Sequence, residues 1–115
     1  NGHIRRVIVD GTGQIIDYGR SQRLFRGAAR EAVMMQYPRC IHPGCRQRVG
    51  NCQADHLQPF TQGGPTSVVN GAPMCAKHNR YKTRGYRNIR GPDNTWHTYR
   101  PDGTHIGQQA PLRTS

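Results

Sequence analysis

The sequence lacks any long apolar run, and acidic and aromatic residues are scarce. No segment approaches the roughly 20 apolar residues that a transmembrane helix needs, and none near the N-terminus resembles the apolar part of a signal peptide. These absences exclude a membrane partner and favour a soluble, cytoplasmic protein. Only 33% of the 115 residues are apolar, so the core of this one domain must be thin. Small domains with thin cores usually need a disulfide, a metal ion or a partner chain.

Acidic residues are too few to balance the basic ones. The chain has 17 Lys and Arg against 6 Asp and Glu, a formal net charge of +11. Such a surplus favours a polyanionic partner, because net charge speeds the encounter with phosphate polymers, although a merely cationic surface is the alternative. A stretch with no acid is expected to contact a phosphate backbone, unless it is only a solvated face. Its basic residues are Lys77, Arg80, Lys82, Arg84, Arg87 and Arg90.

Short β-branched runs, turn residues and one helical stretch predict a small α+β domain. Turn signals predict hairpins near both ends, and Pro38 is expected to end the helical stretch. The polar C-terminus gives no reason to expect order. The predicted parts of a single domain over 1–106 are a hairpin at 1–20, a helical region at 22–37, the chemistry-bearing segment at 40–82, a terminal hairpin at 86–106, and a flexible tail at 107–115.

Cysteine and histidine spacing predicts a structural zinc site. Cys40 and Cys45 stand on either side of a short Pro-Gly turn, and Cys75 precedes His78 by three positions. Two ligand pairs from distant segments match the tetrahedral N/S site that zinc prefers. We therefore assign Cys40, Cys45, Cys75 and His78 to one closed zinc site. Such a site would supply much of the folding free energy of a thin-cored domain.

Two alternatives remain open for the cysteines. Four Cys could form two disulfides, but nothing supports a secreted context and His78 would then have no role. Cys52 could replace Cys40 or Cys45 as a ligand, but a small buried thiol packed as a hydrophobe is the simpler interpretation.

A second group of residues is not explained by zinc. Asp55 and His56 are followed by a Gly-Gly-Pro-Thr-Ser loop, then Asn70, then the Cys75 to His78 pair with Asn79 directly after it. With the leading hairpin, the preceding helix and the trailing Gly-Pro-Asp-Asn-Thr-Trp segment, the chain resembles the zinc-bearing HNH endonucleases of bacteria and phages over nearly its whole length. A capped turn with a surface histidine is the plain alternative for Asp55 and His56.

The resemblance implies a ββα-metal unit, in which two strands and a helix hold a catalytic divalent ion. By position it makes His56 the general base, Asp55 a metal ligand, and Asn70 the middle residue of the motif. Asn79 stands where the last His of the motif would be, which is a departure. A similar Asn occurs in the HNH domain of the RNA-guided CRISPR nucleases, so the departure does not argue for inactivity.

These residue types suit phosphodiester hydrolysis. A neutral imidazole can take a proton from an attacking water, and a hard cation can stabilise the leaving oxygen. Oxygen donors on Asp55 and Asn79 favour Mg²⁺ or Mn²⁺. Asn70 could hold His56 in the productive tautomer through its carbonyl or its side chain. The alternative function is a zinc-stabilised nucleic-acid-binding module without catalysis, which would not need the intact Asp55, His56, Asn70 and Asn79 set.

The expected partner is double-stranded DNA bound through its backbone. One active site would nick one strand, and a double-strand break would require a homodimer or two successive events. The first residue, Asn1, is not Met, which is consistent with a piece of a longer chain whose N-terminal part supplies targeting. No recognition helix is evident, so the sequence gives no recognition site.

Overall fold

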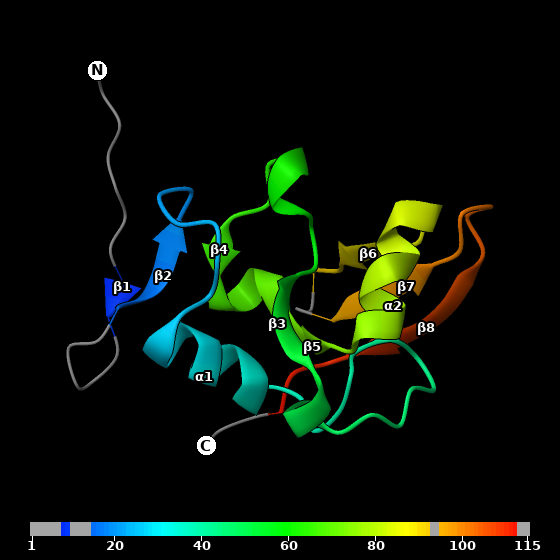
Figure 1. The fold of residues 1–115 in the computed structure, drawn as a ribbon. Helices are drawn as coiled ribbons and strands as arrows, with labels where there is room; N and C mark the ends of the chain where they lie inside the picture. Colours follow the sequence, from blue (N-terminus) through cyan, green and yellow to red (C-terminus); the bar gives the residue numbers. More distant parts are fainter. Residues whose placement is uncertain (1–7, 10–14, 93–94, 113–115) are drawn as a thin grey trace.

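The structure is a computed structural model that describes residues 8–9, 15–92 and 95–112. The described residues form a small mixed α+β fold with the segment between β3 and α2 near its centre (Figure 1). The helices are α1 (Gly27–Met35) and α2 (Ala76–Tyr81), with 3-10 turns η1 (Val49–Asn51), η2 (Phe60–Gln62), η3 (Val68–Asn70) and η4 (Lys82–Arg84). The strands are β1 (Ile8–Val9), β2 (Ile15–Gly19), β3 (Gln53–His56), β4 (Thr66–Ser67), β5 (Gly71–Met74), β6 (Arg87–Arg90), β7 (Trp96–Tyr99) and β8 (His105–Gln109).

In the described part of the chain these strands form small sheets in the orders β1-β2-β4, β3-β5 and β6-β7-β8, with antiparallel pairing throughout. The predicted N-terminal hairpin is therefore present as β1 and β2, while its Asp10 to Gly13 turn lies outside the described residues.

None of the described helices is long and apolar enough to cross a membrane.

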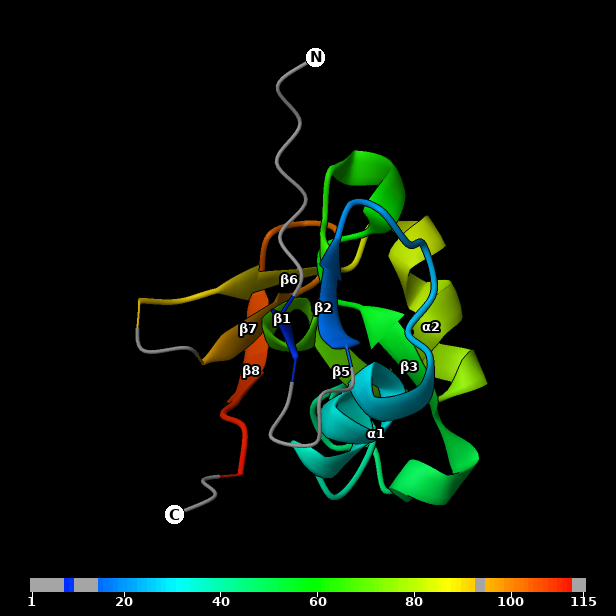
Figure 2. The same ribbon diagram turned by 90° about the vertical axis from the view of Figure 1, so that its left-hand side faces the viewer.

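The β3-β5 pair is the centre of the fold, and it leads directly into α2. Its register places Gln53 opposite Met74 and His56 opposite Gly71. β5 is buried along its whole length, and α1 packs against this pair on one side (Figure 2). The approach of α1 is close at Gly71, because a Cβ there would lie 2.5 Å from Cγ2 of Val33. A glycine is therefore required where β5 crosses α1.

Helix α1 is shorter than the predicted region 22–37. Arg26 is extended, with φ −135° and ψ 156°, and Gly27 has a left-handed φ of +49°, so no helix can continue upstream of it. The residues before α1 instead lead Phe25 into the core. At the other end, the side-chain amide of Gln36 donates hydrogen bonds to the carbonyls of Val68 and Gly71. These bonds tie the end of α1 to the start of β5.

The predicted boundary between a terminal hairpin at 86–106 and a flexible tail at 107–115 is wrong for residues 107–109, which belong to a strand, while 113–115 lie outside the described residues. A third strand, β8, pairs with β7 and extends to Gln109. Further on, the backbone N–H of Leu112 donates to the carbonyl of Gln36, 2.7 Å away. The polar composition of residues 105–109 gave no indication of a strand. The strand is ordered by its pairing with β7 and by its contact with the turn after Cys40. Gly107 fits closely there, since a Cβ on it would lie 2.6 Å from Pro43.

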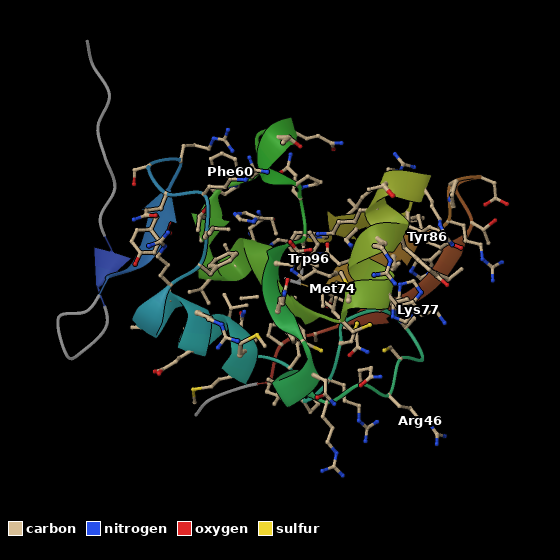
Figure 3. All side chains as sticks on the ribbon, viewed as in Figure 1. Arg46, Phe60, Met74, Lys77, Tyr86 and Trp96 are labelled. Atoms are coloured by element: carbon tan, nitrogen blue, oxygen red, sulfur yellow. The ribbon has the colours of Figure 1, made fainter. Side chains whose placement is uncertain are left out.

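The hydrophobic core is small, as predicted, and it joins α1, the turn that begins at Cys40, the β3-β5 region and β7. Val33, Leu57, Met74 and Trp96 contribute from α1, the loop after β3, β5 and β7 respectively, and Figure 3 shows Met74 and Trp96 near the middle of the molecule. Cys40, Cys52 and Cys75 belong to the same cluster. Thiols therefore fill part of the volume that larger apolar side chains occupy in bigger domains.

Candidate functional site

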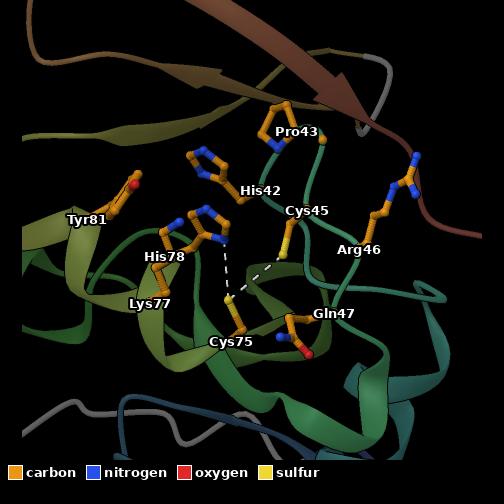
Figure 4. Close-up of a pocket in the computed structure, with 10 residues that line it drawn as sticks. His42, Pro43, Cys45, Arg46, Gln47, Cys75, Lys77, His78 and Tyr81 are labelled. Carbon is orange, nitrogen blue, oxygen red and sulfur yellow. Dashed lines mark hydrogen bonds between the residues drawn. The ribbon is translucent and has the colours of Figure 1, made fainter.

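The structure brings Cys40, Cys45, Cys75 and His78 together, as the sequence predicts. Their ligand atoms all lie within 4.8 Å of one another. Sγ of Cys75 is 3.3 Å from Nδ1 of His78 and 3.9 Å from Sγ of Cys45 (Figure 4), and Sγ of Cys40 is 3.8 Å from Nδ1 of His78. Tetrahedral zinc with ordinary bond lengths requires separations of about 3.6–3.8 Å between its ligand atoms. The group has the size and the donor set of a structural zinc site.

Local backbone structure explains why these ligands meet. The first pair lies on a tight turn closed by the N–H of Cys45 donating to the carbonyl of His42, and by the N–H of Cys40 donating to the carbonyl of Gln47. The second pair lies where β5 ends and α2 begins, with Cys75 as the extended N-cap residue. Its N–H donates to Sγ of Cys40, 3.4 Å away, and such a bond stabilises a thiolate.

Burial and hydrogen bonding shift the pKa values of Cys40 and Cys75 in opposite directions. Burial, assisted by nearby Cys45 and Cys75, raises the pKa of Cys40 to about 12, although hydrogen bonds from the backbone of Cys75 and His42 oppose this. Burial also raises the pKa of Cys75, but hydrogen bonds from the backbone of His78 and from the thiols of Cys40 and Cys45 outweigh burial and lower it. A zinc ion held between the three sulfurs would supply the positive charge that stabilises them as thiolates.

Aromatic rings cover the open side of the thiol and imidazole group. His42 stacks on His78 with ring centroids 3.9 Å apart and an interplanar angle of 5°, and Tyr81 meets both rings edge-on. Burial lowers the pKa of His42 to about 4, helped by the neighbouring His78 and Lys77. His42 is therefore neutral near pH 7, which suits a ring stacked on a ligand imidazole. The sequence analysis did not assign it a role.

The positions of the four cysteines bear on the role of Cys52 and on the disulfide alternative. All four cysteines are free thiols. Cys52 is buried, its Sγ donates to the carbonyl of Arg48 3.4 Å away, and it lies outside the group of close ligand atoms. Cys52 is thus a small core residue, as predicted.

Asp55 and His56 end strand β3, beside the start of the long loop to β5. The ring of His56 is buried at 8% exposure, with Phe25 at 4.8 Å and Phe60 at 5.7 Å between ring centroids. Burial lowers the pKa of His56, and although the Asp55 carboxylate raises it, the cations Lys82, Arg23 and Arg20 lower it. The imidazole is therefore mostly neutral near pH 7, the form in which it can accept a proton.

Thr66 determines which nitrogen of His56 accepts that proton. Oγ1 of Thr66 lies 2.7 Å from Nε2 of His56, and it donates its own hydrogen to the carbonyl of Arg23, 3.2 Å away. Because a hydroxyl has one hydrogen, Thr66 must accept from Nε2–H of His56. Neutral His56 is thus assigned the tautomer with its lone pair on Nδ1. The sequence analysis missed Thr66, because a threonine in a Gly-Gly-Pro-Thr-Ser loop looks like a turn residue.

Asn70 does not hold His56, which corrects the predicted role. Its side-chain Oδ1 accepts from the N–H of Gln58, and its Nδ2 donates to the carbonyls of Gln58 and Pro65. Its own carbonyl accepts from the N–H of Leu57. All of these partners lie in the loop after β3. The buried Asn70 amide therefore closes that loop over residues 57–65, while Thr66 holds the histidine ring.

The loop after β3 requires a glycine at position 64. A Cβ at Gly64 would lie 1.9 Å from the carbonyl oxygen of Gln58 and 2.9 Å from Nδ2 of Asn70. Arg20 holds the outside of the same loop, donating to the carbonyls of Phe60 and Gly64 with its guanidinium 3.8 Å from the Phe60 ring centroid. The side-chain amide of Asn70 and the guanidinium of Arg20 therefore both hold this loop in place.

Lys82 contacts both members of the Asp55–His56 pair. Its Nζ is 2.5 Å from Oδ2 of Asp55 and also donates to the carbonyl of His56. We expected Lys82 to lie with the phosphate-contacting residues, but its ammonium group lies inside the candidate site. Asn79 is half-buried on α2, three positions before Lys82. Residues at this spacing share a helix face, so the Asn79 position lies on the face that Lys82 directs toward Asp55.

The other predicted phosphate-contacting residues are exposed. They are Lys77, Arg80, Arg84, Arg87 and Arg90. The first three recur at helical spacing along α2 and η4, and Lys77 also lines the pocket beside Cys75 and His78. Figure 3 shows Lys77 on the outer side of α2. Arg20 and Arg23, which are also exposed, add positive charge beside His56 from a segment whose basic residues the sequence analysis did not single out.

The fold and the site define a small α+β domain with a Cys₃His group suited to zinc. No family model matches the chain, and no solved structure matches it. The uncharacterized protein Rv3776 of Mycobacterium tuberculosis is 35% identical over 88 residues, which cover 73% of this chain and 17% of that protein. The chain thus spans less than a fifth of the length of the curated relative it matches.

Proposed function

We propose that this chain is the catalytic domain of a metal-dependent DNA endonuclease of the HNH type. The carrying observation is the environment of His56: a neutral imidazole with Nε2 engaged by Thr66, next to Asp55 and among the cations Arg20, Arg23 and Lys82. A binding module has no need for a buried histidine whose Nδ1 lone pair has no partner among the residues that the structure describes. The order β3, β5 and α2, with the Cys₃His group at the start of the helix, supports the ββα-metal interpretation.

The donor set suits a divalent ion of the Mg²⁺ or Mn²⁺ type. Asp55 offers a carboxylate and Asn79 an amide oxygen, both hard ligands. When bound, the ion would stabilise the negative charge that develops on the leaving oxygen.

The residues of the chain would supply the other parts of hydrolysis. Nδ1 of His56 takes a proton from water, and the water oxygen forms a bond to phosphorus. The bond from phosphorus to the 3′ oxygen breaks, and that oxygen takes a proton from solvent, leaving a 5′-phosphate and a 3′-hydroxyl. Thr66 keeps the ring oriented throughout, and Arg23 is placed to attract the phosphate. One such site nicks one strand, so a double-strand break requires two copies or two events.

One observation favours the alternative of a non-catalytic nucleic-acid-binding module. The carboxylate of Asp55 is already paired with Lys82, so its charge is balanced without a divalent ion. In that case the exposed basic face of α2 would bind a phosphate backbone and Asp55 would be purely structural.

Supercoiled plasmid distinguishes the two functions. The zinc-loaded protein with added Mg²⁺ or Mn²⁺ should convert the plasmid to the nicked form, and His56→Ala should be slower by about 10²–10⁴-fold. His105→Ala is the matched control, because it removes an exposed imidazole from β8. If the wild type and His56→Ala both retard the plasmid on a gel and neither nicks it, the nuclease proposal is wrong and the binding module is right.

A further inference from the structure

A groove next to the candidate site has no role in the function proposed so far. Its volume is about 640 Å³, and it lies between the loop after β3 and strand β6. Lys82, which contacts Asp55 and His56, forms part of its wall, and so does Asn70. The groove therefore adjoins the place where a phosphodiester would be cut.

Two large apolar side chains in the wall of the groove are unusually exposed to solvent. Val69 and Ile89 line it at 52% and 47% exposure, although most large apolar side chains of the domain are buried. Leu57 and Trp96 also line it, and both are nearly buried. Figure 3 shows Trp96 between β3 and the C-terminal sheet. A flat apolar ligand could replace water against these surfaces.

The polar lining of the groove is cationic and rich in amides. Lys82, Arg87 and Arg90 line it, and no Asp or Glu is among the described lining residues. Gln58 and Asn88 also line it, and side-chain amides can hydrogen-bond the edges of any nucleobase. The occupant should therefore combine a flat apolar face, a polar edge and a negative charge.

We propose that this groove binds an unpaired nucleotide next to the cleaved phosphodiester. A base fits the apolar walls and the amides, its phosphate fits the cations, and the volume is in the range of small-ligand sites. An acidic peptide would match the cations but not the exposed apolar side chains of Val69 and Ile89. This inference rests on the proposed function for its position and narrows the substrate class: nucleic acid with single-stranded character at the cut, such as a bulge, a junction or a single strand.

Binding without added Mg²⁺ or Mn²⁺ tests the groove independently of cleavage. Fluorescence anisotropy of the zinc-loaded wild type, at one salt concentration, compares a fully paired duplex, the same duplex with a one-nucleotide bulge, and single strands of DNA and RNA. We expect the bulged duplex to bind at least tenfold more tightly than the paired one. The comparison of single-stranded DNA with single-stranded RNA shows whether the sugar affects the binding affinity.

Variants with equal charge changes isolate the groove. Ile89→Glu should abolish the preference for the bulge, whereas Met35→Glu should keep it, because Met35 is 71% exposed on α1 and does not line the groove. If Ile89→Glu fails to fold, Arg87→Gln is compared with Arg100→Gln, since both arginines are exposed and only Arg87 lines the groove. A bulge nucleotide replaced by 4-thiothymidine should cross-link to peptides containing Val69, Tyr86 or Ile89.

Each outcome decides one question. Equal binding of bulged and paired duplexes, equal behaviour of the Glu variants, or cross-links elsewhere would overturn the groove assignment even if the plasmid is nicked. Displacement of bulged DNA by a Glu-rich peptide at a lower concentration than by single-stranded DNA would also overturn it, in favour of an acidic protein partner. A preference for the bulge with no nicking would retain the groove and reject the nuclease.

Discussion

The ammonium group of Lys82 lies 2.5 Å from Oδ2 of Asp55 and also donates to the carbonyl of His56. A single lysine thus joins the end of α2 to the two residues that end strand β3. A divalent ion held by Asp55 would be repelled by this ammonium group at short range. The proposed metal site and the observed ion pair are therefore in competition.

Lys82→Met should make Asp55 more available to a divalent ion. Removal of one competing charge predicts Mn²⁺ affinity higher on the order of tenfold, measured by electron paramagnetic resonance on the zinc-loaded protein. Lys77→Met is the matched control, since Lys77 is an exposed lysine of α2 whereas Lys82 is the lysine that pairs with Asp55. Equal Mn²⁺ affinity in both variants and the wild type would show that Lys82 does not compete for Asp55.

Zinc content tests the Cys₃His assignment. Close to one tightly held zinc ion per chain is expected, and Cys40→Ser or Cys75→Ser should lose both the ion and the fold. Structural zinc contributes about 10–16 kcal/mol of apparent binding free energy in small domains, and whole domains are stable by only about 5–15 kcal/mol. Metal analysis and circular dichroism provide the readout.

Cys52→Ser is the control for that experiment. A serine there can still donate to the carbonyl of Arg48, so the variant should keep its zinc. Full zinc content in Cys75→Ser, or loss of zinc in Cys52→Ser, would contradict the ligand set.

Thr66→Val tests the tautomer of His56. The change keeps the side-chain shape but removes the acceptor for Nε2–H, so the ring should populate both neutral tautomers and nicking should slow by about 10–100-fold. Nitrogen NMR of labelled histidine reads the tautomer directly, and Thr66→Ser should restore it. Thr98→Val is the control, because Thr98 is also buried and its hydroxyl donates to Oδ1 of Asn88 rather than contacting a histidine. An unchanged His56 spectrum in Thr66→Val would refute this role.

Asn70→Ala should loosen the loop after β3 and leave the His56 ring in place. Loss of the side-chain hydrogen bonds to Gln58 and Pro65 predicts a free energy of unfolding lower by about 2–3 kcal/mol, measured by urea denaturation. Hydrogen exchange at the amide of Gln58 should accelerate. Asn51→Ala, which removes only one exposed side-chain bond to Gln47, should change little. A changed histidine tautomer with an unchanged loop would restore the originally predicted role of Asn70.

The sequence was most informative where chemistry depends on spacing. Cys40, Cys45, Cys75 and His78 could be assigned to one site because a zinc site needs two ligand pairs on tight turns, and that need is visible along the chain. Pro38 correctly indicated that α1 ends before it.

Contacts between distant segments could not be predicted. Thr66 reaches His56, Lys82 reaches Asp55, and Arg20 holds the loop that carries Phe60, but nothing local distinguishes these residues from turn or surface residues. Strand β8 was missed because its pairing with β7 and its contact with Pro43 provide the order that its polar residues do not. Gly27 shortened α1 through a backbone angle that a sequence pattern does not show.

The most direct measurement is a single-turnover cleavage of a labelled DNA duplex in ¹⁸O-enriched water, with Mg²⁺ or Mn²⁺ and zinc-loaded protein. The proposed hydrolysis predicts a nicked product with a 5′-phosphate that carries one solvent oxygen, formed by the wild type and by His105→Ala and slowed at least about 10²-fold in His56→Ala. A product without solvent oxygen, or equal rates for the wild type and His56→Ala, would contradict the account.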